Sequence, residues 1–340
     1  MTDAALAALG GLPRTPLATL PTPLQRAPRL SEAVGVEVWI KRDDLTGLLL
    51  GGNKARKLEF LCGEALARGA DTLVTGGGAG SNHTQLTAAA CARLGLDCVV
   101  VCYGDAPASD PLGLRITRRL GAEVVFTGSP DRTSVDAHLE EMAEKLTTEG
   151  RNPYVIPRGG ASAVGAVGYA AAAFELADQM AGEGLGAATV LLATGSCGTQ
   201  AGLVAGAKLA PPDRHDPDAD AAGPRLDVLG VPVSRPPEEV VERVARLATG
   251  CAARLGSDRV FAADDVHLLG GYLGPGYGKP SPEGDEAALL AARTEGLLLD
   301  PVFTAKAMAA LVAEARAGNL TGPTVFLHTG GAPAALAALP

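Results

Sequence analysis

Short apolar runs alternate with longer amphipathic segments along most of the chain. The short runs are rich in Val, Ile and Leu and predict strands at 38–40, 72–75, 98–101, 123–126, 154–156, 190–193, 228–231 and 325–327. The longer segments repeat apolar residues with helical spacing and predict helices near 56–68, 82–94, 111–120, 133–148, 162–181, 198–209, 237–255, 285–296 and 304–317. The strands are continuously apolar, as in strands covered on both faces. This pattern predicts an α/β fold with two open, mostly parallel, twisted sheets and helices on both faces.

The composition excludes several classes of protein. A length of 340 residues suffices for about two domains. Lys and Arg number 29 against 38 Asp and Glu, and no basic tract gathers them, so no nucleic-acid partner is expected. The six cysteines form no Cys-x-x-Cys pair, which favours reduced thiols and no metal site. No apolar run approaches the length of a membrane span and no positively charged leader opens the chain, so we expect a soluble, cytoplasmic protein with no membrane partner.

Lys54 is the first candidate for chemistry. It follows Gly51-Gly52-Asn53, at the start of a predicted helix with an apolar face. An amine is nucleophilic only without its proton, and burial or the neighbouring charges of Arg56 and Lys57 would lower the pKa of Lys54 toward that state. The run therefore predicts a Schiff-base lysine, with a solvated basic helix start as the alternative.

The loops that leave the predicted strands are the next candidates, because ligands bind at the carboxyl ends of strands in open α/β sheets. After the strand at 72–75 comes a glycine-rich loop that ends in Ser81, Asn82 and His83 at a helix start. Backbone N–H groups and polar side chains so placed can bind an anion such as a substrate carboxylate. An ordinary helix cap is the alternative interpretation.

A second loop, 194–202, has the residues of a phosphate site. Its glycines let the backbone approach a ligand, the hydroxyls of Thr194, Ser196 and Thr199 add donors, and a helix start follows. It lacks the lysine of a Walker loop and the spacing of a dinucleotide fingerprint. A third loop, 328–333, would bring the Thr329 hydroxyl to the same sheet edge. A reactive lysine, a phosphate cup and a hydroxyl together indicate pyridoxal 5′-phosphate (PLP), although the cup alone is also compatible with a plain turn.

Several motifs give the chain a family resemblance. They are Leu20-Pro21-Thr22-Pro23-Leu24, Ile40-Lys41-Arg42-Asp43-Asp44, the run from Gly51 to Phe60, Ser81-Asn82-His83, Ala193-Thr194-Gly195-Ser196, Gly276-Tyr277-Gly278 and the run from His328 to Pro333. In order and spacing, from about residue 12 to the end, they resemble the D-cysteine desulfhydrase and 1-aminocyclopropane-1-carboxylate (ACC) deaminase family.

The resemblance implies a PLP enzyme of fold type II, like the β subunit of tryptophan synthase, and a homodimer. It implies a large cofactor domain at 1–53 plus 163–340, a small inserted domain at 54–162, and an active site in the cleft between them. Lys54 would bind the cofactor and move the Cα proton. The remaining implied roles are cofactor binding by Asn82, Thr194, Gly195, Ser196, Gly198 and Thr199, catalysis by Ser81 and Tyr277, and substrate binding by Ser81, Asn82, His83, Tyr277 and Phe303.

Two departures from the family pattern bear on the activity. Phe303 replaces a second active-site tyrosine and cannot exchange a proton. ACC deaminases resemble one another in a Tyr-Glu pair where this chain has Phe303-Thr304, so ring opening is disfavoured. A neutral hydroxyl, from Thr304 or Thr329, would meet the cofactor's ring nitrogen and leave a weaker electron sink, which is compatible with expelling a good β leaving group.

The resulting hypothesis is β-elimination on a small β-substituted amino acid, with D-cysteine giving pyruvate, ammonia and hydrogen sulfide. Relatives often carry Gln just before the Ser-Asn pair, where this chain has the glycine-rich stretch 76–80. The identity of the leaving group on the β-carbon therefore stays open. It could be sulfite from L-cysteate, chloride from β-chloroalanine or a biosynthetic thiol carrier. ACC deamination, β-replacement and a catalytically silent PLP-binding homologue also stay open as hypotheses.

Overall fold

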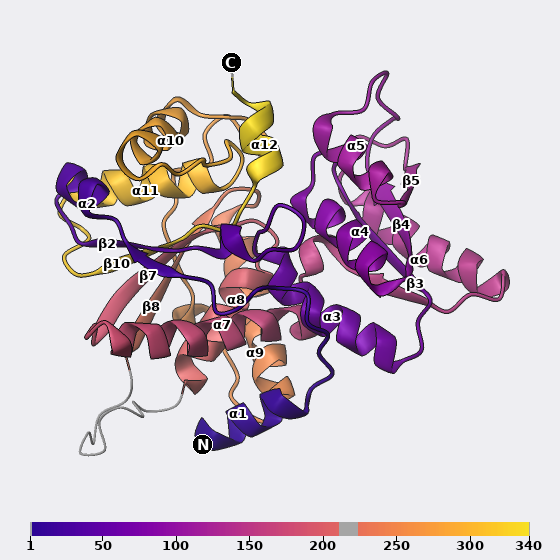
Figure 1. Cartoon of the computed structure of the whole chain (residues 1–340), viewed down its shortest axis with the longest axis horizontal. Helices are drawn as coiled ribbons and strands as arrows, with labels where there is room; N and C mark the ends of the chain where they lie inside the picture. The colour runs from indigo at the N-terminus through magenta and orange to yellow at the C-terminus, as the bar shows by residue number, and fades with distance from the viewer. Residues whose placement is uncertain (1, 211–223, 340) are drawn as a thin grey trace.

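The computed structural model describes residues 2–210 and 224–339, which form two sheets flanked by helices (Figure 1). The larger sheet has the order β1 (Leu24–Arg26), β2 (Val38–Lys41), β10 (Thr324–Leu327), β7 (Ala187–Thr194), β8 (Arg225–Pro232) and β9 (His267–Leu268). The smaller sheet has the order β5 (Glu123–Phe126), β4 (Asp97–Cys102), β3 (Thr72–Gly77) and β6 (Pro153–Ile156). Neighbouring strands are parallel except β1 and β2.

Both faces of the larger sheet are covered because successive strand residues point to opposite sides. Val190 and Leu192 of β7 pack with helices α7 (Ala163–Gly182), α8 (Gly198–Leu209) and α9 (Pro237–Arg254), which α1 (Thr2–Gly11) joins. Leu191 and Ala193 pack with α2 (Pro28–Val34), α10 (Pro282–Glu295) and α11 (Thr304–Arg316) on the other face. Alternate residues of one apolar run therefore hold two separate helix layers.

The smaller sheet repeats this arrangement. Helices α3 (Lys54–Ala67), α4 (Asn82–Leu94) and α5 (Leu112–Arg119) cover the face that presents Leu73 and Val100. Helix α6 (Ser134–Thr148) covers the opposite face, which presents Val74, Val99 and Val101. The short helix α12 (Ala332–Ala337) follows the last strand and lies near α5 (Figure 1).

The structure confirms the predicted fold class and contains each predicted strand and helix. The sequence pattern did not predict five of the observed elements, which are α1, β1, α2, β9 and α12. Helix α1 is almost entirely Ala, Leu and Gly and shows no polar face, β1 and β9 have 3 and 2 residues, and α2 and α12 have 7 and 6. Segments this short carry too little periodicity to be recognised.

The smaller sheet lies between β2 and β7 in the chain, inside the span predicted for an inserted domain. The predicted boundaries, 54–162 within 1–53 plus 163–340, stay a prediction. All six cysteines are free and buried. In the described part of the chain, no helix has the length and apolarity that crossing a membrane requires.

A buried ionic network fixes helix α3 against the larger sheet. The Arg56 guanidinium donates to both oxygens of Asp43, at 2.9 Å each, and to both oxygens of Glu175 on α7, at 2.8 and 2.9 Å. Asp43 also accepts hydrogen bonds from the hydroxyls of Thr22 and Tyr169. Asp43 is fully buried, and although burial alone would raise its pKa, the Arg56 charge holds that pKa below its ordinary value. Each charge in this network therefore depends on the others.

Arg56→Met is expected to lower the free energy of unfolding by about 3–5 kcal/mol, because it leaves the Asp43 charge buried without its partner. Urea denaturation followed by circular dichroism measures this loss. Arg26→Met, which breaks the exposed pair with Glu37, is the matched control and should cost less than about 1 kcal/mol. Equal losses in the two variants would show that the network does not carry this stability.

Candidate active site

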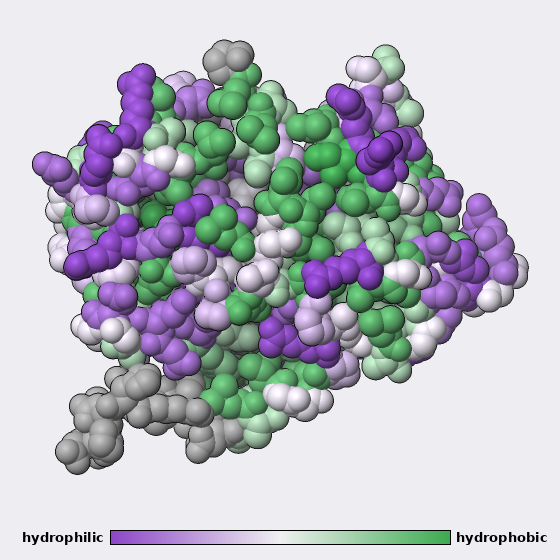
Figure 2. Space-filling model, viewed as in Figure 1, coloured by the Kyte–Doolittle hydropathy of each residue, from purple (hydrophilic) through white to green (hydrophobic). Residues whose placement is uncertain are grey.

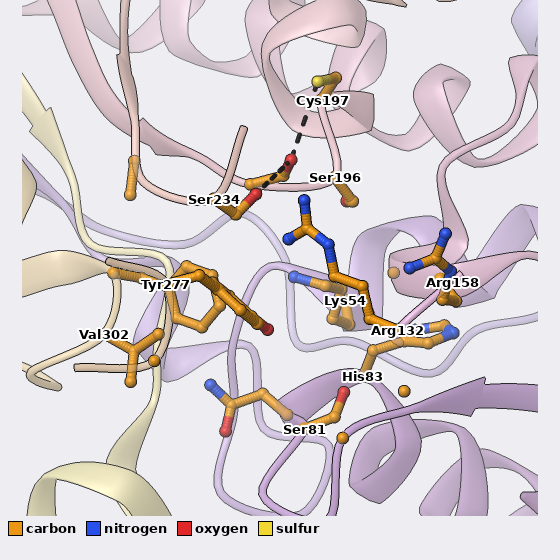
Figure 3. A pocket seen from close by; sticks show the side chains of 18 of the residues that line it. Lys54, Ser81, His83, Arg132, Arg158, Ser196, Cys197, Ser234, Tyr277 and Val302 are labelled. Carbon is orange, nitrogen blue, oxygen red and sulfur yellow. Dashed lines mark hydrogen bonds between the residues drawn. The ribbon is translucent and has the colours of Figure 1, made fainter. Parts of the chain in front are cut away.

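A cavity of about 380 Å³ lies between the two sheets, at the carboxyl ends of their strands (Figure 3). The smaller sheet contributes the loop from Gly76 to His83, Tyr103, Arg132 and Arg158 to its wall. The larger sheet contributes the loop from Ala193 to Gln200, Ser234, Asp300 and Thr329. Since strand ends of two parallel sheets meet here, the cavity has the position expected for a ligand site in an α/β protein.

Lys54 stands in the wall of this cavity as the first residue of α3. Its Nζ donates to the Asn53 side-chain oxygen at 2.7 Å, and the Asn53 amide nitrogen donates to the Thr199 hydroxyl at 3.0 Å. Burial lowers the pKa of Lys54 from its ordinary value of 10.5 to about 8, against the opposing charge of Asp300. A usable fraction of the amine is therefore neutral near physiological pH.

Two expectations about the residues beside Lys54 are corrected. The alternative of a solvated basic helix start is wrong, since the Arg56 and Lys57 side chains are at most 2% exposed. Arg56 does not lower the pKa of Lys54 either, because its charge is engaged with Asp43 and Glu175 while burial produces the shift.

Lys57 lies one turn further along α3, behind the loop at 195–198. Its Nζ donates to the Gly159 carbonyl at 3.2 Å and lies 3.0 Å from the position a Cβ of Gly198 would take. Burial and the nearby charge of Lys54 hold the pKa of Lys57 well below its ordinary range. An anion in this loop would reverse that effect and charge the amine.

The loop from Gly195 to Gly198 forms a cup at the start of α8. Cys197 adopts φ +74°, a left-handed conformation that is uncommon outside glycine, and Ser234 donates to the Gly195 carbonyl at 3.0 Å. Arg243 donates to the Ser196 carbonyl at 3.3 Å. With its carbonyls held from outside and a 12-residue helix behind it, the cup can present N–H groups to an anion.

The predicted donors of this cup are not equally available. The Thr194 hydroxyl donates to the Gln200 side chain at 2.8 Å, inside the wall. The Thr199 hydroxyl accepts from Asn53, which leaves its own hydrogen for a ligand. Gly195, Ser196 and Thr199 line the cavity, and Gly198 begins the helix beneath them.

Ser81 and Asn82 line the wall of the cavity that lies opposite the cup. Ser81 is the N-cap of α4, with its hydroxyl 3.5 Å from the Thr84 amide, and Asn82 is the first residue of the helix. The two predictions for this segment, a helix cap and an anion site, are therefore compatible. The long contact from Ser81 is a weak cap, so backbone N–H groups at the start of α4 stay free for a ligand.

His83 lines the same wall but is buried, with 2% of its surface exposed. The Thr75 hydroxyl donates to the Ile156 carbonyl at 2.8 Å, so it accepts from His83 Nε2, also at 2.8 Å. His83 Nδ1 is then an acceptor, and no described residue hydrogen-bonds to it. Burial holds the pKa of His83 well below its ordinary range, so the ring is neutral.

The residues predicted near the substrate form the third wall. The rings of Tyr277 and Phe303 meet edge to face with centroids 6.2 Å apart, and both line the cavity. Thr329 also lines it. Thr304 does not: it is fully buried, and its hydroxyl donates to Asp300 at 2.7 Å. The structure thus brings Thr329, and not Thr304, to the cavity.

Several lining residues escaped the sequence prediction. Asp300 is buried at the start of α11, where it accepts from the backbone N–H groups of Val302, Phe303 and Thr304. Burial raises the pKa of this carboxyl. Arg132 and Arg158 come from loops that follow β5 and β6, so the rule that directs attention to strand carboxyl ends would have found them had it been applied to those strands.

The fold and the cavity define a PLP-dependent enzyme of fold type II. The sequence pattern of the family described as "Pyridoxal-phosphate dependent enzyme" matches residues 16–330. The chain is 43% identical over 330 residues to D-cysteine desulfhydrase from Salmonella choleraesuis (strain SC-B67), covering 96% of each protein. A solved ACC deaminase homologue is 36% identical, with a TM-score of 0.86 over 98% of this chain and 96% of that one. The chain therefore belongs to the D-cysteine desulfhydrase and ACC deaminase family.

A more distant solved structure shares the fold. The processed form of threonine deaminase isoform 2 from Solanum lycopersicum is 19% identical, with a TM-score of 0.63 over 97% of this chain and 84% of that one. The residues of the cavity also fit the cofactor itself. A lysine with a lowered pKa, a glycine cup backed by Lys57, and Thr329 supply an amine, a phosphate site and a neutral hydroxyl.

Lys54 in the cofactor-free protein is expected to react with acetic anhydride half-maximally near pH 8, because only the neutral amine attacks and its pKa is about 8. Mass spectrometry of samples labelled between about pH 6 and 11, which brackets the shifted and the ordinary lysine pKa, gives the curve. The exposed Lys145, labelled in the same samples, corrects for reagent decay. A half-maximum close to the ordinary value of 10.5 would contradict the lowered pKa.

Proposed function

We propose that this protein catalyses β-elimination on a small β-substituted amino acid, with D-cysteine as the first substrate to test and pyruvate, ammonia and hydrogen sulfide as products. The observation that carries the proposal is the cavity itself, which a lysine with a lowered pKa shares with the N-terminus of α4 and the glycine loop at 195–198. The 43% identity to a D-cysteine desulfhydrase across nearly the whole chain supports the same reaction.

Residues in different parts of the cavity would have different roles in the reaction. The cup at 195–199 and Lys57 would hold the phosphate of PLP, Asn82 would bind an oxygen on its ring, and Thr329 would meet its ring nitrogen. Bound there, PLP withdraws electrons from Cα and so acidifies the Cα proton. The Lys54 amine would accept that proton, while Ser81 and the N–H groups at the start of α4 would hold the substrate carboxylate.

The wall formed by Tyr277 and Phe303 bears on the choice among reactions. Phe303 offers no hydroxyl, and the neighbouring Thr304 is turned into the wall by Asp300. Only Tyr277 of this pair can exchange a proton with a substrate. This favours loss of a good leaving group, which needs no protonation, over opening of a carbon ring. ACC deamination is the second candidate function, supported by the 36% identity to an ACC deaminase homologue.

The wild-type protein with PLP is expected to show a visible absorption band that Lys54→Ala lacks, and to form pyruvate from D-cysteine. Absorption spectra and a lactate dehydrogenase-coupled assay measure the two results. Supplying ACC in place of D-cysteine would give 2-oxobutanoate if the second candidate is correct. A band without pyruvate from D-cysteine, L-cysteate or β-chloroalanine would contradict β-elimination, and trapping by an added thiol would point to β-replacement. A band with no turnover of any of these substrates would favour a catalytically silent PLP-binding homologue, and absence of the band would contradict the proposed role of Lys54.

Lys57→Met is expected to weaken PLP binding by about 10- to 100-fold, the range for loss of one hydrogen bond to a charged group. The unfolding temperature of the cofactor-free protein should stay the same or rise. Burial lowers the pKa of Lys57 in the folded state, so near neutral pH this lysine destabilises the folded state relative to the unfolded chain, and methionine removes that cost. Absorbance titration gives the affinity, with the exposed Lys145→Met as control. Unchanged affinity would place the phosphate away from Lys57.

We also propose a cytoplasmic homodimer, as the family resemblance implies. Large apolar side chains are exposed on and near α12 and α5, including Leu336, Leu339 and Leu112. Figure 2 shows apolar surface in this part of the molecule. Exposed apolar groups of this kind are typical of protein interfaces.

A further inference from the structure

Tyr103 brings a second tyrosine hydroxyl to the cavity, in addition to that of Tyr277. It directly follows β4, at the carboxyl end of a parallel strand, where ligands bind in α/β sheets. Tyr169 and Tyr272 lie away from the cavity, and each donates its hydroxyl hydrogen to a carboxylate. The Tyr103 hydroxyl has no such partner in the described part of the chain. A phenol hydroxyl can donate one hydrogen bond, so this donor is available to a ligand.

The glycine at position 78 makes room for the Tyr103 side chain. A Cβ built on Gly78 would lie 2.9 Å from the Tyr103 hydroxyl oxygen and 3.2 Å from two carbons of its ring. The φ angle of Gly78 is not in the left-handed region, so its backbone conformation does not require glycine. The close approach of Tyr103 does require it, because a side chain at position 78 would displace the hydroxyl.

The loop beside this hydroxyl leads into the N-terminus of α4. The Ser81 N–H donates to the Gly78 carbonyl at 2.9 Å, which closes a tight turn. The Gln85 side-chain amide donates to the carbonyls of Gly80 and Ser81, at 3.4 and 3.2 Å. These contacts fix the turn that presents Ser81 and the first N–H groups of α4 to the cavity. Gly78 therefore contacts both Ser81 and the Tyr103 ring.

A carboxylate at the start of α4 can accept hydrogen bonds from more than one side, because its two oxygens offer about four acceptor positions. The Ser81 hydroxyl and the N–H groups of α4 would take some of these positions. Tyr103 also lies near Tyr277, which comes from a loop of the larger sheet: burial, and after it the nearby Tyr103, raises the pKa of Tyr277. The Tyr103 hydroxyl therefore borders the space between the two sheets, where a carboxylate would have acceptor positions left.

We propose that the Tyr103 hydroxyl donates a hydrogen bond to the substrate carboxylate, together with Ser81 and the start of α4, and that Gly78 is glycine because it makes room for this contact. The inference rests on the proposed function, which places the substrate carboxylate at α4. It adds a substrate-binding residue from the end of β4 that the sequence did not predict. Hydrogen bonds to a charged group are stronger than those between neutral groups, so loss of this donor is measurable as binding.

The test compares Tyr103→Phe with Tyr154→Phe in the PLP-loaded protein. Both variants lose one hydroxyl and keep the ring, and Tyr154 lies under the Arg68 guanidinium, away from the cavity. The ligands are D- and L-alanine, which have no leaving group on Cβ, and ethylamine, which is alanine without its carboxylate. The shift of the visible PLP band on titration gives each affinity. Tyr103→Phe should reduce the preference for alanine over ethylamine by about 10- to 100-fold, and Tyr154→Phe should leave it within about threefold.

A second pair of variants tests the room that Gly78 provides. Gly78→Ala should weaken alanine binding more than Gly80→Ala does, because a Cβ on Gly80 meets no heavy atom within 4 Å. Neither glycine has a left-handed φ angle, so both backbones can accept alanine. An equal effect of the two substitutions would contradict the contact between position 78 and the Tyr103 hydroxyl.

The remaining outcomes separate this inference from the proposed function. If Tyr103→Phe weakens alanine and ethylamine equally, or leaves both unchanged, Tyr103 does not bind the carboxylate and the inference is overturned. Weaker PLP binding by Tyr103→Phe, in an absorbance titration, would assign the residue to the cofactor and also overturn it. If the alanine preference depends on Tyr103 but D-cysteine, L-cysteate and β-chloroalanine give no pyruvate, β-elimination fails and the role of Tyr103 stands.

Discussion

The buried ion pair between Arg56 and Asp43 is the interaction on which the active site depends. Arg56 lies two residues after Lys54 in the first turn of α3, and Asp43 follows β2 of the larger sheet. Glu175 ties the same guanidinium to α7, and Lys41 adds a second cation at 2.5 Å from Glu175. Through these contacts the start of α3, and with it the Lys54 amine, is held against the larger sheet. Charges buried in this way are costly unless all are satisfied, which makes the geometry specific.

Position along a single helix then separates three basic residues with three different roles. Arg56 faces the sheet and stays charged because a guanidinium cannot be deprotonated in a protein. Lys54 lines the cavity, Lys57 lies behind the loop at 195–198, and burial lowers the pKa of both. Residues three apart lie on neighbouring positions of a helix surface. In the proposed function, one turn of α3 would therefore supply both the reactive amine of Lys54 and a phosphate contact from Lys57.

Much of this could be predicted from the sequence because the signals were local or repeated. The apolar strands of both sheets and the glycine loops at 76–80 and 195–198 are visible in the amino-acid order, and so is Lys54 after two glycines. The direction in which Arg56 points could not be predicted, since its partners lie 13 and 119 residues away. The partner of Thr304 could not be predicted either. Its hydroxyl could hydrogen-bond to a cofactor or to a carboxylate, and only the folded structure shows that it donates to Asp300.

The distribution of lysine and arginine is compatible with the proposal that one cavity binds anions and also carries out base chemistry. Desolvation lowers the pKa of a buried lysine far enough to free its amine, but leaves an arginine charged. Lys57 is buried behind the loop at 195–198 and Lys54 stands half-buried in the cavity wall, while the half-buried Arg132 and Arg158 reach the cavity from loops of the smaller sheet. In the proposed function, the charged arginines would attract the carboxylate of an amino-acid substrate, and the neutral amine of Lys54 would accept its Cα proton.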